Sequence, residues 1–257
     1  MILRILPPMS TMREPVTITR VINPCVLIEV AGRAVLTDPY FDDHWFVPMN
    51  EPIGLRPEQV PELAAILGGH RVFDHWQPGS LGDHPHRSTT PVLVASSSMV
   101  RRARRAGFDR AELVGWHETR ELGDGLTVEC LPGERSGGMT TNAYLLTTPT
   151  VSIYVATEAR HLEPITAIAA SRQADIAILP IDGLRFAGRR LVMNAGEALA
   201  AARTLGARTL VPIHYSQRPI PGLLACTSGI DDLLRLARDD TEVRVLHAPA
   251  GTPIRVE

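Results

Sequence analysis

The apolar residues of this chain fall into short runs separated by turn residues, and this spacing limits the possible fold more than any other feature. Short runs rich in Val, Ile and Leu and bounded by Gly, Pro, Asn or Asp predict β-strands, and they dominate the first part of the chain. From Leu162 onward, segments with helical spacing alternate with strand-like runs. Strands first, then helices alternating with strands, predict two sheets covered by helices, an α/β sandwich.

The predicted strands cover residues 16–20, 26–30, 33–37, 91–95, 126–131, 142–147, 151–156, 176–180, 209–213, 243–247 and 253–256. Residues 61–67 predict a strand or a short helix, and Ala31-Gly32 predicts a hairpin turn. The predicted helices cover residues 96–106, 162–172, 195–205 and 231–238. Because no low-complexity linker or repeat divides the chain, we expect residues 1–257 to form a single domain.

Composition excludes several classes of protein. A formal net charge of −2 argues against a general nucleic-acid binder, which usually carries a basic excess. No run of about 18 apolar residues predicts a membrane span, and residues 1–15 lack the pattern of a signal peptide. The three cysteines are scattered, without a Cys-x-x-Cys pair, so neither a disulfide framework nor a cysteine zinc site is expected. These features predict a cytoplasmic protein.

Polar residues with metal-binding chemistry follow apolar runs at two places. His70 follows Gly68-Gly69 at the end of such a run, and Asp74-His75 comes four residues later. His214 closes the predicted strand 209–213. Imidazole nitrogens and carboxylate oxygens are the usual non-thiolate ligands of zinc, and catalytic zinc sites commonly use three of them plus a water. Taken singly, each of these residues is more often only hydrogen-bonded, so their combination carries the prediction.

Several segments, in chain order, resemble the metallo-β-lactamase superfamily, most closely its small lactonase-like and phosphodiesterase-like hydrolases. Thr37-Asp38-Pro39 follows the first hairpin, as Thr-Asp-Pro does in the family. The family's His-x-His-x-Asp-His signature aligns with residues 70–75, and its Pro-x-x-His with residues 132–135. Its Gly-Asp-Thr aligns with residues 157–159, and the His that closes a late strand aligns with His214. The resemblance covers roughly residues 16–250 and implies the four-layer αβ/βα sandwich of that fold.

The first metal site of the family is largely missing. In the family, that metal is bound by both histidines of His-x-His and by the histidine of Pro-x-x-His. The aligned residues here are His70, Val72 and Arg135. An isopropyl group and a guanidinium cannot bind a cation, so only one of the three ligands remains.

The second metal site is retained. Its family ligands, the Asp, the adjacent His and the final His, align with Asp74, His75 and His214. The bridging Asp of the family is replaced by Glu158, which is one methylene longer but still a carboxylate. The resemblance therefore implies one divalent metal ion, bound at this second site. Zinc is the expected ion, although iron or manganese would also accept such ligands.

We expect a metal-dependent hydrolase, or a related biosynthetic enzyme, acting on a small-molecule ester, thioester or lactone. Phosphodiester cleavage is less favoured, because a two-metal clamp on the attacking and leaving oxygens is not available. Glu158 or His70 would act as general base. Arg135 would pair with Glu158 and orient the substrate, since a guanidinium makes forked hydrogen bonds to oxygens. An Arg135 turned outward to solvent remains the alternative.

Two other interpretations stay open. The chain could be a catalytically inactive protein of the same fold that binds a small ligand or partner. It could also hold two metals, with the missing ligands supplied by Glu134 or by His84 and His86. The aromatic segment at residues 44–46 is a candidate wall of the substrate entrance. The sequence leaves the oligomeric state open.

Overall fold

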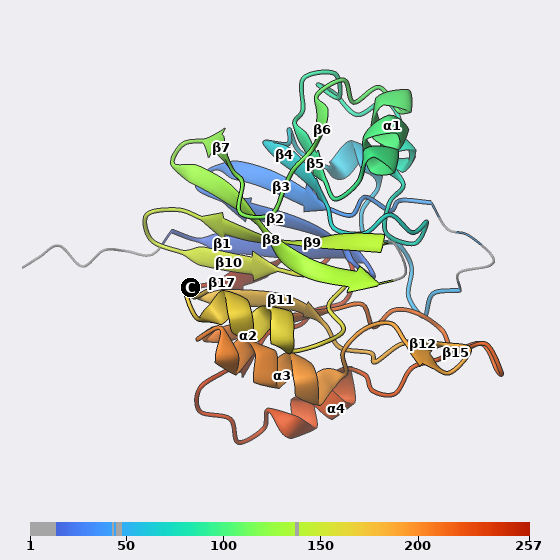
Figure 1. Cartoon of the computed structure of the whole chain (residues 1–257), viewed down its shortest axis with the longest axis vertical. Helices are drawn as coiled ribbons and strands as arrows, with labels where there is room; N and C mark the ends of the chain where they lie inside the picture. Colours follow the sequence, from blue (N-terminus) through green and yellow to red (C-terminus); the bar gives the residue numbers. More distant parts are fainter. Residues whose placement is uncertain (1–13, 43, 45–47, 137–138) are drawn as a thin grey trace, which may run out of the picture.

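The computed structural model describes residues 14–42, 44, 48–136 and 139–257, and it leaves out the side chains of residues 135, 136 and 139. Two seven-stranded sheets lie face to face, with α1 on the outer side of one sheet and α2, α3 and α4 on the outer side of the other (Figure 1). This is the predicted four-layer αβ/βα sandwich, the metallo-β-lactamase fold.

The first sheet has the order β17 (Ile254–Val256), β1 (Val16–Ile22), β2 (Cys25–Val30), β3 (Arg33–Thr37), β4 (Ala65–Gly68), β5 (Val92–Val94) and β6 (Ala111–Leu113). The second has the order β16 (Arg244–Val245), β14 (Thr209–Ile213), β11 (Ile176–Pro180), β10 (Ser152–Val155), β9 (Met139–Thr147), β8 (Leu126–Ser136) and β7 (Thr119–Gly123). A small third sheet has the order β13 (Arg189–Arg190), β12 (Arg185–Phe186) and β15 (Leu224–Ala225).

The α-helices are α1 (Ser97–Arg105), α2 (Glu163–Ala169), α3 (Ala195–Thr204) and α4 (Ile230–Leu236), and two short 3₁₀ turns cover Pro57–Gln59 and Pro78–Leu81. Capping residues fix two helix starts, because the side chain of Ser96 accepts from the backbone of Met99 and that of Asn194 accepts from Glu197. No described helix is long and apolar enough to cross a membrane.

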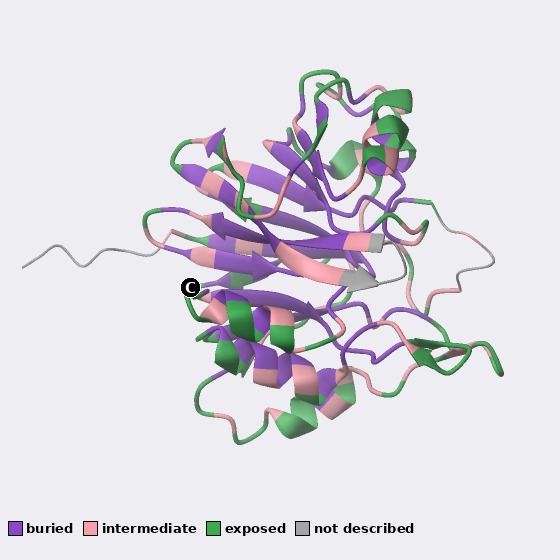
Figure 2. Ribbon diagram, in the orientation of Figure 1, coloured by how far each residue is buried: buried purple, intermediate pink, exposed green. Residues whose placement is uncertain are grey.

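Three apolar cores hold the layers together. The central core lies between the two sheets, where residues such as Ile18 and Ile28 pack with Ile153 and Val211 from the opposite sheet. The other two cores fill the space between each sheet and its helices. Figure 2 shows the result: most strands of the two large sheets are buried, whereas β7 and the third sheet are largely exposed and the helices are buried on one face only.

Most of the predicted elements are confirmed, and the errors concern strand length and strands that were missed. The bounds of β3, β11 and β14 are those expected, and the predicted turn at Ala31-Gly32 has positive φ at both residues. The predictions for 126–131 and 142–147 were too short, since β8 and β9 continue past a bulge between Pro132 and Arg135. Strands β6 and β7 and the third sheet were missed, because they are short, exposed or polar.

We predict that a methyl group at Gly68 destabilises the fold. An added Cβ would lie 2.6 Å from the ring of Trp76, which is fully buried, and 2.7 Å from the terminal carbon of Met99. Gly68→Ala should lower the free energy of unfolding by about 1–3 kcal/mol through overpacking, measured by urea denaturation.

The matched control is Gly196→Ala in α3, where the nearest atom to an added Cβ is 3.5 Å away. That variant should be neutral or more stable by about 0.4–1 kcal/mol, because alanine reduces the entropy of the unfolded chain. Equal stability of the two variants would contradict the packing argument.

Candidate metal centre

The candidate site lies where strands from both sheets end. Strands β3 and β4 run parallel in one sheet, and β10, β11 and β14 run parallel in the other. The residues that follow their carboxyl ends are therefore delivered to one edge of the sandwich. They are Asp38 after β3, His70 after β4, Glu158 after β10, Asp182 after β11 and His214 after β14.

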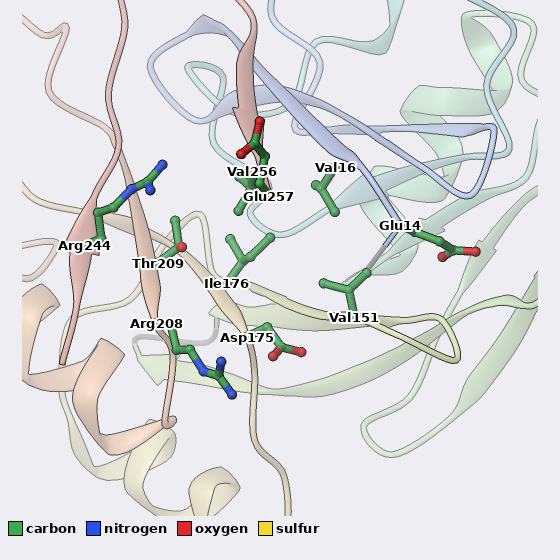
Figure 3. A pocket seen from close by; sticks show the side chains of 10 residues that line it. All are labelled: Glu14, Val16, Val151, Asp175, Ile176, Arg208, Thr209, Arg244, Val256 and Glu257. Atoms are coloured by element: carbon green, nitrogen blue, oxygen red, sulfur yellow. The ribbon is translucent and has the colours of Figure 1, made fainter. Parts of the chain in front are cut away.

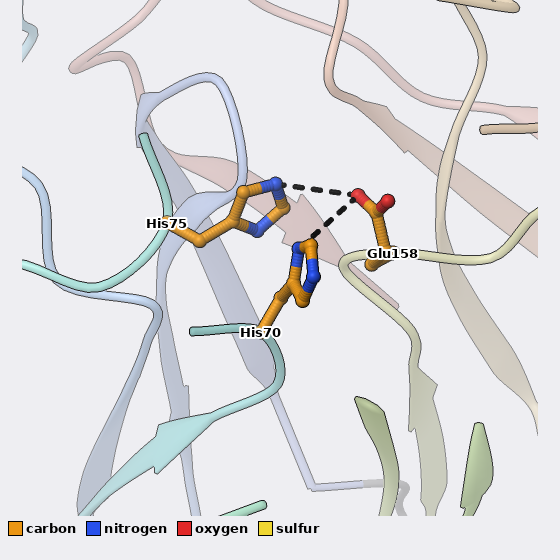
Figure 4. A group of neighbouring side chains, drawn as sticks. All are labelled: His70, His75 and Glu158. Atoms are coloured by element: carbon orange, nitrogen blue, oxygen red, sulfur yellow. Dashed lines mark ion pairs between the residues drawn. The ribbon is translucent and has the colours of Figure 1, made fainter. Parts of the chain in front are cut away.

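Two groups of candidate metal ligands meet at this edge. One group is His70, His75 and Glu158, and the other is Asp74, His75 and His214, with the ligand atoms of each group within 4.8 Å of one another. Figure 4 shows the imidazoles of His70 and His75 directed at the same carboxylate oxygen of Glu158. That oxygen, Oε2, lies 3.8 Å from Nδ1 of His70 and 3.4 Å from Nε2 of His75.

Two buried aspartates orient the histidine rings. Oδ2 of Asp38 accepts a hydrogen bond from Nδ1 of His75 at 2.9 Å, and Oδ2 of Asp182 accepts from Nδ1 of His214 at 3.2 Å. In both rings Nδ1 is thus occupied, and Nε2 is the nitrogen available to bind a metal ion. A carboxylate behind the outer nitrogen fixes the tautomer of a metal-binding histidine and raises its basicity.

The backbone at this edge is held in a strained conformation. Asp38 has φ 36° and His214 has φ 57°, in the left-handed region that non-glycine residues rarely adopt. Both residues are fully buried, and Gly69 donates its backbone N–H to Oδ1 of Asp38 at 2.6 Å. Strain of this kind is kept where the surroundings impose a particular side-chain position, which is typical of functional sites.

The charges of the site favour a bound cation. Burial alone would raise the pKa of Glu158, but the hydrogen bond from His75 and the nearby His70 and His214 outweigh it and lower the pKa to about 2. Burial alone would lower the pKa of His75, but hydrogen bonds with Asp38 and Glu158 raise it well above its usual value. Glu158 is thus ionised, and its negative charge beside Nε2 of His75 favours a cation at this place.

His70 has a different environment. Its ring is buried, and Nδ1 has no hydrogen-bond partner. Burial lowers the pKa of this imidazole, although the charge of Glu158 opposes the change. An unpartnered buried nitrogen is costly, so this atom is suited to a ligand or to a proton delivered by one.

The donor set fits a divalent metal ion. All five candidate ligands offer nitrogen or carboxylate oxygen, as zinc, iron and manganese accept. Both groups require His75, whose Nδ1 is already engaged by Asp38, so only Nε2 is available to a metal. One nitrogen lone pair binds one ion. The two groups therefore cannot both use His75 to bind separate ions.

The other predicted residues include one that lines the cavity and several that lie wholly or partly outside the described residues. Val72 lines the same cavity as His70 and His75, so its isopropyl group takes a place in the wall. Arg135 lies in β8 opposite Thr140, but its side chain is outside the described residues, and its role in orienting substrate stays a prediction. Of the aromatic segment 44–46, Trp45 and Phe46 also lie outside the described residues.

The residues proposed as ligands of a second metal have other partners or line other cavities. Glu134 accepts hydrogen bonds from the backbone of Arg160 and from the backbone and ring of His161. Nε2 of His84 is bonded to the backbone oxygen of Pro61 at 3.1 Å. His86 lines a different cavity. None of the three lines the cavity that contains His75.

Neither the role of Asp38 nor the presence of Asp182 at the site was predicted from the sequence. Asp38 stands in the Thr-Asp-Pro segment that carried part of the resemblance, but nothing in the segment shows which partner it binds. Asp182 follows the apolar strand β11, which is parallel to β14. A polar residue at the carboxyl end of a strand next to the His214 strand was the available signal.

A buried ion pair supports the loop after His214. The guanidinium of Arg20 in β1 is paired with Glu51 and donates to Oγ of Ser216 at 2.8 Å and to the backbone oxygen of Ala248 at 3.1 Å. It also lies 4.3 Å from the ring centre of Tyr215. One side chain thus connects β1, the loop after β14 and the segment before β17.

The metal centre opens into a cavity of about 480 Å³. A separate cavity of about 220 Å³ is lined by Asp175, Arg208, Arg244 and neighbouring residues (Figure 3). Asp175 and Arg208 stand just before β11 and β14, so this cavity lies at the amino ends of the strands that carry the site at their carboxyl ends. None of the candidate metal ligands lines it.

Comparison with known proteins identifies the family. A model of the beta-lactamase superfamily domain matches residues 33–215, so the chain belongs to that superfamily. A protein of Methanosphaerula palustris named UPF0173 metal-dependent hydrolase is 26% identical over 242 residues, covering 90% of this chain and 96% of the relative. A protein of the same name from Pyrobaculum neutrophilum is 26% identical over 199 residues, with 76% and 81% covered.

Solved structures agree on the fold. A possible metal-dependent hydrolase from Veillonella parvula has a TM-score of 0.77 at 12% identity, covering 93% of this chain and 98% of the other. An isothiocyanate hydrolase from Delia radicum gut bacteria has a TM-score of 0.74 at 18% identity, with the same coverage of both chains. At such low identity, these likenesses establish the fold alone.

We predict that the two aspartates behind the histidines control metal affinity. Asp38→Asn and Asp182→Asn should each weaken zinc binding about 10–100-fold, because the ring nitrogen loses its charged acceptor. The affinity is measured by competition with a chromophoric chelator. Asp231→Asn on the exposed start of α4 is the control and should bind zinc like the unchanged protein. Unchanged affinity in both test variants would show that the aspartates do not support a metal site.

The Arg20–Glu51 pair predicts an acid-dependent stability. Burial alone would raise the pKa of Glu51, but hydrogen bonds with Arg20 and Ser216 lower it below its usual value of 4.5. A lowered pKa stabilises the fold above that usual value, and the stabilisation is lost as the pH falls below it. Glu51→Gln should therefore cost about 1–3 kcal/mol near pH 7, and the difference from the unchanged protein should shrink as the pH is lowered through 4.5.

The control for this pair is Glu58→Gln, which removes an exposed ion pair with Arg56. Exposed pairs contribute about 0–1 kcal/mol, so this variant should unfold at nearly the same urea concentration as the unchanged protein. A pH-independent difference between Glu51→Gln and the unchanged protein would contradict the assignment of the effect to the Glu51 charge.

Proposed function

We propose that this chain is a metal-dependent hydrolase that opens a small-molecule ester, thioester or lactone with one divalent metal ion. The observation that carries the proposal is the cluster in which two candidate ligand groups share the buried His75 in the wall of a cavity. The relatives named metal-dependent hydrolases support the reaction class. Asp74, His75 and His214 are the proposed ligands, and zinc is the proposed ion, with iron and manganese as alternatives.

The remaining residues favour acyl substrates. Phosphodiester hydrolysis is commonly assisted by two metals that stabilise both the attacking and the leaving oxygen. In this chain Val72 replaces a ligand of the family's first metal, and its side chain lines the cavity. Opening an ester, thioester or lactone requires only a polarised carbonyl and a nucleophilic water, which one ion can provide.

Two side chains of the site, Glu158 and His70, are placed to transfer the proton of the attacking water. A divalent ion held here would supply a Lewis acid and lower the pKa of water to about 7. Glu158 lies beside Nε2 of His75, and His70 lies beside Glu158, so either is placed to take a proton from the attacking water. The water oxygen adds to the carbonyl carbon, the C–O or C–S bond breaks, and the proton passes to the departing alcohol or thiol.

The first test is the metal content of the protein, purified without a histidine tag or chelator and measured by elemental analysis. We expect about one equivalent of zinc, iron or manganese per chain. His75→Ala should lose both the metal and any esterase, thioesterase or lactonase activity, because it removes the nitrogen common to both ligand groups.

The control is His247→Ala, an exposed histidine outside the cavity, which should keep metal and activity. Full activity in His75→Ala would rule out the proposed mechanism. A protein that contains no metal and binds none when it is added would instead favour the catalytically inactive, ligand-binding alternative.

A further inference from the structure

The cavity at the metal centre is polar at one end and apolar over most of its wall. His75, His214, Asp74 and Glu158 form the polar end. Away from them the wall is built largely from apolar side chains, among them Val72, Phe73, Leu184, Phe186, Ile220 and Leu223. Its volume of about 480 Å³ is within the range of about 300–1,000 Å³ typical of cavities that hold small organic ligands.

Large apolar side chains are exposed around this cavity. Six such residues are exposed in the described part of the chain, and three of them line the cavity: Phe73 (41% exposed), Phe186 (49%) and Leu223 (44%). The other three, Leu113, Leu234 and Leu236, lie elsewhere on the surface. Apolar residues gathered at one exposed place mark a binding site more often than isolated ones do.

The two sides of the apolar wall come from different parts of the fold. Val72 and Phe73 lie between His70 and Asp74, in the segment after β4. Phe186 belongs to β12 of the small third sheet and pairs with Leu224 of β15, and the backbone N–H of Ala187 donates to the oxygen of Leu223 at 2.8 Å. This sheet therefore holds Phe186 opposite Leu224, next to Leu223 in the chain, and all three residues line the cavity.

The charged groups of the described lining are few. Besides the metal-centre residues, the lining contains one cationic side chain, Arg160, whose Nε donates to the backbone oxygen of Leu191 at 3.2 Å. Gln217 is the other polar residue of the described lining. A ligand with a carbonyl at the polar end would thus extend an uncharged part along the apolar wall.

We propose that the substrate carries an alkyl or aryl tail of medium length, which lies against Phe73, Phe186 and Leu223 while its carbonyl is at the metal centre. This inference rests on the proposed function and names its substrate class. The apolar part of the wall includes Val72, which stands where the family has a ligand of its first metal. The replacement of that ligand by valine therefore adds apolar surface that the tail can contact.

Binding of unreactive compounds tests the tail separately from catalysis. The probes are straight-chain primary amides from four to ten carbons, titrated into the metal-loaded protein by calorimetry. We expect the affinity to rise about two- to fourfold per added methylene until the cavity is filled, as burial of apolar surface requires. The same length preference should appear in kcat/KM for p-nitrophenyl esters of the matching acids.

Two exposed wall positions and one distant position provide the variants. Phe186→Ser and Leu223→Ser should reduce the gain per methylene, whereas Leu113→Ser, a residue of β6 that is 51% exposed outside the cavity, should not. Affinity that does not depend on amide length, or an equal loss in all three variants, would overturn the inference.

The two proposals fail in different ways. If the amides show the length dependence but no ester, thioester or lactone is hydrolysed, the proposed function fails and the apolar tail site stands. If esters are hydrolysed at a rate independent of tail length and the amides bind equally, the function stands and the inference is overturned.

Discussion

The carboxylate of Asp38 is the interaction on which the site depends. It is fully buried, and its two oxygens serve two partners, the backbone N–H of Gly69 and Nδ1 of His75. These two bonds fix both ends of the loop that follows β4, and with it the positions of His70 and Asp74. A buried carboxylate is tolerated only where positive charge or strong hydrogen bonds compensate its lost hydration. Asp38 therefore orients His75 and also makes a cation on the far side of that ring favourable.

The ring of His75 can bind only one ion. Since Asp38 occupies one nitrogen of His75, a second ion would have to do without this ring, using His70 and Glu158 together with residues that the family supplies from positions 72 and 135. Val72 offers no lone pair, and a guanidinium repels a cation. The ligands of the family's first metal can therefore be lost without disturbing the site formed by Asp74, His75 and His214. Asp38 and Asp182 orient His75 and His214, and neither lies at a lost position.

Sequence predicted the framework of the site better than its supporting partners. The strands β3, β11 and β14 were recognisable because their apolar runs are bounded by polar or turn residues, and their ends located the loops that carry the ligands. The extension of β8 and β9 depends on their mutual pairing past a bulge, which no local pattern of residues 132–136 specifies. Asp182 was missed for a related reason: only the parallel pairing of β11 with β14 brings it to His214.

The apolar wall of the cavity was beyond sequence analysis because it is made by short strands with polar neighbours. Strand β12 is only Arg185 and Phe186, and a single aromatic residue between arginines resembles an exposed loop. Its significance appears only when the third sheet pairs it with Leu224, so that it lines the same cavity as Leu223 and Phe73. The candidate metal ligands follow short strands that are almost wholly buried, which holds them firmly. The apolar wall comes partly from this small, exposed sheet, so the fold separates the part that holds the chemistry from the part that can vary with the substrate.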